Sequence, residues 1–250
     1  MFGLFEKKSI PKEYTKKHLE KDCSSKRINN REAYEVCDSY SHSGYPLCVA
    51  MKKAKDVSLI QSLLKYGADP ETAVSELPYY FNTNSKALQM FINAGLKVNN
   101  FYRQKTLLGL CIDHLHLVKT LVENGADINL GDKSIYSTYD PPISLAAQYK
   151  KYEVMKYLVN CGALLDDKRF NETPLLYAVL GNSEGAIHMM GHSAANPDPK
   201  CVKLLIDAGA NVNYSKKSGA KILDIADFVD NNEVIKLLEN AGATRSGISP

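Results

Sequence analysis

The feature that most constrains this 250-residue chain is a short phrase that recurs six times. Each copy has an apolar pair, two or three variable residues, a glycine, a small or apolar residue and usually a polar ending. Self-similarity of this kind predicts one structural unit repeated along the chain, with a continuous seam in place of a round core. Successive glycines lie 28, 30, 37, 47 and 33 residues apart. The copies are residues 63–69 (LLKYGAD), 91–99 (FINAGLKVN), 121–129 (LVENGADIN), 158–166 (LVNCGALLD), 205–213 (LIDAGANVN) and 238–244 (LENAGAT).

The phrase is typical of a helix end and the turn that follows it. The apolar pair closes an amphipathic helix, and the glycine supplies the left-handed position that ends it. Asp or Asn a few residues later favours the turn that leaves the helix. A second phrase, about nineteen residues upstream, opens another helix, as in Thr173-Pro174, where an N-cap precedes a proline at the first helical position. Each unit is therefore predicted to be a helix, a tight turn, a second helix and a projecting hairpin-like loop.

The openings Pro141-Pro142-Ile143 and Thr173-Pro174-Leu175, with the Gly-Ala endings, resemble the ankyrin repeat family. That family has a unit of about 33 residues with a TPLH-type opening. Residues 141–163 and 221–243 align to it without a gap through both helices, and the resemblance covers about residues 40–244. It implies an all-α solenoid of helix-turn-helix units with projecting hairpin-like loops, and a role in protein binding without catalysis.

The resemblance divides the chain into a leader, an array and a short tail. The second unit is short and lacks the opening phrase, and the turn between the helices of the third is about two residues short. The fifth carries about fifteen extra residues, an insertion near 182–199. The expected boundaries are a leader at 1–39, units at 40–72, 73–101, 102–131, 132–167, 168–215 and 216–244, and a tail at 245–250.

Charge is concentrated at the start of the chain. Residues 1–31 hold nine Lys or Arg against four Asp or Glu, a local charge of +5 within a total of +3. We expect this basic leader to form a helical cap over the apolar end of the array, with contact to an acidic partner or membrane surface as the alternative. The small total charge does not argue for nucleic acid as a partner.

Hydropathy and cysteine spacing bear on location. No apolar run is long enough to form a transmembrane segment. None of the six cysteines forms a CxxC pair, so all are expected to be reduced, with Cys111 and Cys161 acting as small hydrophobes inside apolar runs. These features favour a cytoplasmic protein.

Two groups of residues invite a chemical interpretation. His188 and His192 could share a metal ion on a helix, but Met189 stands where a zinc protease needs its Glu, so we favour an ordinary loop. Cys111 lies near His114 and His116, and a buried structural cysteine is the better account. The chain has no phosphate-binding or dinucleotide-binding glycine loop and no nucleophile elbow. We therefore expect no catalytic residue, no metal and no cofactor.

Partner contacts are expected on the concave face formed by the inner helices and the projecting loops, here called fingers. Binding energy usually concentrates in aromatic and Arg anchors. For each tyrosine, the alternative is a partly buried packing residue. The predicted contact residues are Lys133, Tyr136, Tyr139, Gln148, Tyr149, Arg169, Phe170, Tyr214, Lys216 and Lys217.

Three functional hypotheses follow. The first is a non-enzymatic interaction module or adaptor that binds another protein through the concave face. The second is a bacterial effector acting on host proteins, because the Lys-, Asn- and Tyr-rich sequence and its irregular units resemble ankyrin proteins of intracellular bacteria. The third is a metal-binding or enzymatic site at the insertion of the fifth unit. The sequence does not identify the partner.

Overall fold

A computed structural model describes most of the chain from residue 57 onward. The described residues are 47, 51, 57–76, 85–102, 104–133, 139–167, 169, 172–181 and 196–247. The basic leader, Tyr136, Phe170, His188 and His192 lie outside them.

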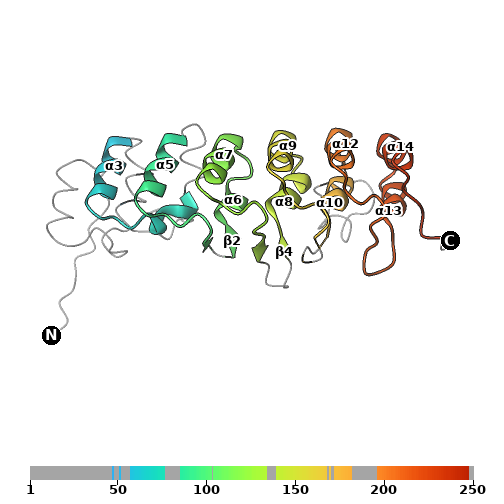
Figure 1. The fold of residues 1–250 in the computed structure, drawn as a ribbon, viewed down its shortest axis with the longest axis horizontal. Coiled ribbons are helices and arrows are strands. Elements are labelled where there is room, and N and C mark those ends of the chain that lie inside the picture. The colour runs from blue at the N-terminus through green and yellow to red at the C-terminus, as the bar shows by residue number, and fades with distance from the viewer. Residues whose placement is uncertain are drawn as a thin grey trace, which may run out of the picture.

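The described residues form a row of helix pairs. Figure 1 shows the second helix of each unit along one edge, with the first helices beneath them and the fingers projecting on the other side. The second helices are α3 (Val57–Lys65), α5 (Ser85–Asn93), α7 (Leu115–Glu123), α9 (Tyr152–Asn160), α12 (Pro199–Asp207) and α14 (Asn232–Asn240). The first helices of units three to six are α6 (Leu107–Leu110), α8 (Pro142–Gln148), α10 (Pro174–Leu180) and α13 (Ile222–Val229). The 3-10 helix η3 (Pro70–Glu76) follows the glycine turn after α3. The all-α repeat solenoid is confirmed.

The recurring glycines end the second helices as the sequence predicted. All six adopt positive φ angles, from 84° at Gly242 to 99° at Gly95. The Thr173 hydroxyl accepts a hydrogen bond from the Leu176 N–H at 3.3 Å and caps α10, with Pro174 in the first turn. Local sequence therefore sets both ends of a unit.

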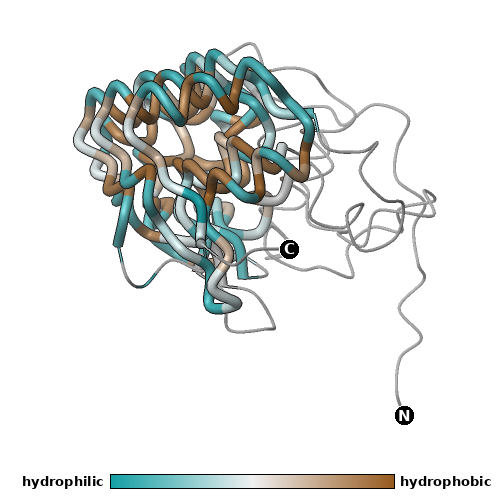
Figure 2. Tube along the Cα trace, turned by 90° about the vertical axis from the view of Figure 1, so that its right-hand side faces the viewer, coloured by the Kyte–Doolittle hydropathy of each residue, from teal (hydrophilic) through white to brown (hydrophobic). Residues whose placement is uncertain are grey.

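The apolar side chains form one seam along the array. A single cluster of buried residues runs from Leu47 in the first unit to Leu238 in the last. Figure 2 shows the apolar positions gathered between the rows of helices. Small residues such as Ala146 and Ala226, both 0% exposed, let neighbouring helices approach closely.

Three local features differ from the sequence-based expectation or refine it. A 3-10 helix, η3, begins at Pro70, three residues after Gly67, and spans the expected boundary between units one and two at residues 72 and 73. The two residues missing from unit three shorten the first helix, α6, to four residues, and do not shorten the turn. Cys161 is exposed because it lies beyond the last turn of α9, so its placement in the apolar interior was wrong.

Two fingers contain short antiparallel strands. Strands β1 (Phe101–Tyr102) and β2 (Lys105–Thr106) pair, and so do β3 (Asp132–Lys133) and β4 (Tyr139–Asp140). Among the described helices, none is long and apolar enough to cross a membrane.

Candidate functional site

The fingers are held in register by a hydrogen bond that recurs at each junction between units. The side chain four residues after each recurring glycine accepts the backbone N–H found two residues after the next glycine. Because the same contact recurs, neighbouring fingers have a fixed spacing. The acceptors and donors are Glu71 and Lys97 (3.0 Å), Asn99 and Asp127 (2.8 Å), Asn129 and Leu164 (2.9 Å), Asp166 and Asn211 (3.0 Å), and Asn213 and Thr244 (2.9 Å).

A second contact stiffens three of these turns from within. The Asp127 carboxylate accepts the Asn129 N–H at 2.8 Å, and the Asn211 side chain accepts the Asn213 N–H at 2.9 Å. Asp69 and Glu71 repeat this arrangement at 3.0 Å. The polar ending of the phrase thus makes the expected turn and also joins one unit to the next.

Exposed aromatic rings lie at the ends of two first helices. Tyr149, just after α8, is 45% exposed, and Gln148 beside it is half-buried. Phe228 in α13 is also 45% exposed and occupies the position of Gln148 two units later. These side chains present apolar area on the inner face, defined here as the side formed by the first helices and the fingers.

Charged groups lie next to Tyr149. Lys150 has a positive φ of 55°, and it is followed by Lys151, whose Nζ lies 2.6 Å from Asp113 Oδ1 of the preceding unit. The ion pair connects the inter-helix turns of units three and four. Aromatic residues are enriched at the centre of protein interfaces and lysines are depleted there, so Tyr149 is the contact candidate of this stretch.

Two predicted contact residues are joined to Glu172. The Tyr214 hydroxyl donates to Glu172 Oε2 at 2.7 Å, and Lys216 Nζ lies 3.3 Å from Glu172 Oε1. Burial, together with the Glu172 hydrogen bond, raises the pKa of Tyr214 to about 12. Tyr214 and Lys216 therefore tie the last finger, which follows Gly209, to the start of unit five near Glu172. This corresponds to the packing alternative for Tyr214.

Arg169 also makes an intramolecular contact. Its guanidinium donates to both Asp167 oxygens at 2.7–3.1 Å, and these bonds lower the pKa of Asp167 to about 2. Arg169 and Lys217 are both exposed. Lys133 lies opposite Tyr139 in the β3–β4 pair.

Cys111 does not have the surroundings of a nucleophile. Its side chain is 0% exposed, and burial raises the pKa of the thiol to about 12. The nearby His114 is the N-cap residue of α7, and its ring lies 6.0 Å from that of His116. The prediction of a buried structural cysteine is confirmed. Within the described ranges, no three His, Cys, Asp or Glu side chains gather closely enough to hold a metal ion.

Sequence reasoning missed two residues of this face. Phe228 could have been found by register, because it aligns with the predicted contact residue Gln148. Glu172 carried no such signal, since its partner Tyr214 lies 42 residues away.

Comparison with known protein families gives one finding. A model described as ankyrin repeats (3 copies) matches residues 113–199 and residues 143–245. Together the two matches span residues 113–245, which is more than half of the 250 residues.

Proposed function

Because the chain belongs to the ankyrin repeat family, whose repeats are generally protein–protein interaction modules, we propose that it is an adaptor that binds another protein through its inner face. The family is typically non-enzymatic, and the proposal includes no catalytic step. The partner's contacts would fall on the first helices and the fingers of units four to six.

The observation that carries this proposal is the exposure of Tyr149 and Phe228 at the ends of first helices. Large aromatic rings contribute much of the energy at protein interfaces when a partner covers them. The junction hydrogen bonds fix the distance between fingers, so a partner meets a preorganised surface and little entropy is lost on ordering it. Lys217, exposed in the last finger, adds a positive charge to this surface.

Arg169, Tyr214 and Lys216 have a different role in this proposal. Each makes an internal contact, with Asp167 or Glu172, so a partner would have to compete with an existing bond. We therefore assign Tyr214 and Lys216 to holding the fingers in place. Tyr149 and Phe228 are assigned to contacting the partner because each is 45% exposed.

The test is affinity capture from a cell lysate with mass spectrometry, using matched variants. Tyr149→Ala/Phe228→Ala removes both inner-face rings. Tyr66→Ala is the control, because Tyr66 is 64% exposed at the end of a second helix in the first unit. We expect the double variant to lose partners that both the wild type and Tyr66→Ala retain. Capture of the same proteins in equal amounts by all three would contradict the assignment of the inner face.

A further inference from the structure

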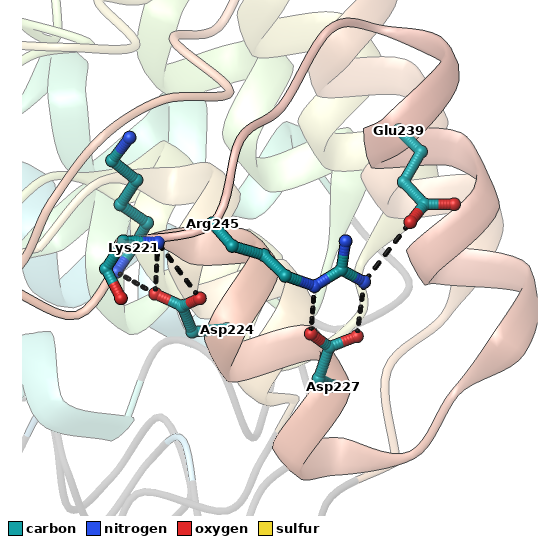
Figure 3. A network of polar contacts seen from close by, with 6 residues as sticks. Lys221, Asp224, Asp227, Glu239 and Arg245 are labelled. Carbon is teal, nitrogen blue, oxygen red and sulfur yellow. Dashed lines mark hydrogen bonds and ion pairs between the residues drawn. The ribbon is translucent and has the colours of Figure 1, made fainter. Parts of the chain in front are cut away.

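Two neutral side chains join the second helices of units two and three. Gln89 Nε2, in α5, donates to Asn124 Oδ1 at 3.1 Å, and Asn124 Nδ2, just after α7, donates back to Gln89 Oε1 at 2.9 Å. The side-chain contact between the helices of unit six is ionic by contrast, because Arg245 bonds Asp227 of α13 and Glu239 of α14, as Figure 3 shows. We call the reciprocal contact between Gln89 and Asn124 the amide pair.

Asn124 stands directly before one of the six recurring glycines, Gly125. Asn124-Gly125 is also the only Asn-Gly dipeptide in the sequence. At this position no other unit has a side-chain amide, so the amide pair is particular to the junction of units two and three. The residues before the other recurring glycines are Tyr66, Ala94, Cys161, Ala208 and Ala241.

An Asn-Gly dipeptide is chemically labile, because glycine has no side chain to hinder attack by its backbone nitrogen. In deamidation, the nitrogen of Gly125 bonds to Cγ of Asn124 and the bond from Cγ to Nδ2 breaks. Ammonia leaves and takes up the proton of the Gly125 N–H. Water then opens the resulting cyclic imide at either carbonyl and gives aspartate or isoaspartate. Both products carry a negative charge that asparagine lacks.

The folded chain holds both reacting groups of this dipeptide. The amide pair and a bond from Asn124 Nδ2 to the Thr120 carbonyl at 2.8 Å fix the asparagine side chain. The Gly125 N–H donates to the Val122 carbonyl at 3.0 Å, so the attacking nitrogen is already engaged at the helix end. Cyclisation requires the Asn124 side chain to rotate onto this nitrogen. The rate therefore depends on how often these bonds open.

The products of deamidation do not fit the position of Asn124. A carboxylate cannot donate a hydrogen bond, yet Asn124 Nδ2 donates to the Thr120 carbonyl and to Gln89 Oε1. A negative charge at the C-terminal end of α7 is also disfavoured by the helix dipole. Isoaspartate in addition lengthens the backbone next to Gly125, whose φ of 85° ends the helix. Deamidation would therefore weaken the contact between α5 and α7.

We propose that the amide pair protects Asn124 from deamidation, and that Asn124 is a site of spontaneous modification when units two and three separate. The reaction uses water and needs no enzyme. Because neither product can re-form the amide pair, the modification leaves a permanent mark of that separation. The inference does not depend on the proposed partner or on the inner face, since the amide pair joins two second helices.

The test compares deamidation of the folded full chain with and without the amide pair. Gln89→Ala removes the partner of Asn124 and leaves the Asn-Gly dipeptide unchanged. After incubation at pH 8, peptide mapping by mass spectrometry measures aspartate and isoaspartate at position 124. Because the hydrogen bonds of the pair are lost, we expect Gln89→Ala to deamidate about 5–30-fold faster than the wild type. Wild-type protein unfolded in urea should also react faster than folded wild type.

Two controls separate the amide pair from general effects of substitution. Gln61→Ala removes an exposed glutamine from the equivalent position of unit one, and Asn93→Ala removes the other partner of Gln89 Nε2, at 3.0 Å. Both variants should deamidate at the wild-type rate. Equal rates in wild type and Gln89→Ala, or an equal acceleration by either control, would overturn the proposal. Should Gln89→Ala lose its helical circular dichroism, Gln89→Met, which has a similar volume and no amide, takes its place with the same expected results.

Discussion

Removing a single junction side chain, Asn99, should weaken the contact between units two and three. Its Oδ1 accepts the Asp127 N–H at 2.8 Å, and its Nδ2 donates to the Gly125 carbonyl at 3.0 Å. Asn99→Ala loses both bonds, and each such bond contributes about 0.5–1.5 kcal/mol. Because the site is exposed and water replaces part of the loss, we expect a destabilisation of about 1–2 kcal/mol.

The assay combines thermal unfolding with amide exchange at the junction. For a chain of this size, a loss of that magnitude lowers the melting temperature by about 2–4 °C per kcal/mol. The local readout is the Asp127 N–H, which should exchange about 5–30-fold faster in the variant. Asn100→Ala is the control, because Asn100 is also exposed and has no side-chain hydrogen bond within the described part of the chain. If Asn99→Ala and Asn100→Ala unfold and exchange alike, the junction bonds do not hold the units in register.

Three further predictions concern single positions. Gly162→Ala should cost about 1–2 kcal/mol in chemical denaturation and Gly162→Asn less, because φ is 85° and the new Cβ would meet no atom within 4 Å. Mass-spectrometric mapping after iodoacetamide treatment at pH 8 should find Cys161 modified in the folded protein and Cys111 protected until unfolding, because the pKa of Cys111 is raised to about 12. Burial also raises the pKa of Asp166, so folding disfavours the ionised carboxylate. Asp166→Asn should therefore stabilise the protein at neutral pH. This gain in unfolding free energy should shrink as the pH falls through the folded-state pKa of Asp166.

The repeating architecture was predictable because its signals are local. A helix ends at a glycine in a left-handed conformation after an apolar pair, and a helix begins at a threonine before a proline. Both signals act whatever lies elsewhere in the chain. Gly125 and Thr173 are the examples here. The junction bonds were not predicted, although the Asn and Asp residues that make them were noted as turn formers. Their role depends on the distance to the next unit, which periodicity alone does not give.

The contact residues were harder to predict, because residue type alone does not show whether a side chain bonds within the protein or faces a partner. Tyr214 and Arg169 both lie in finger sequences, where an exposed contact residue would also be expected. In the structure, however, Tyr214 bonds Glu172 and Arg169 bonds Asp167. Position within the unit is more informative, since it places Gln148 and Phe228 at equivalent sites on first helices.

The most direct test of the central claim is a hydrogen-exchange footprint of the protein with a captured partner bound. Binding through the inner face predicts slower exchange in the peptides that contain Tyr149 and Phe228. The peptides of α9 and α12 that carry the exposed Lys156 and Lys203 should be unchanged. Protection confined to those second helices, with the first helices and fingers unaffected, would contradict the account.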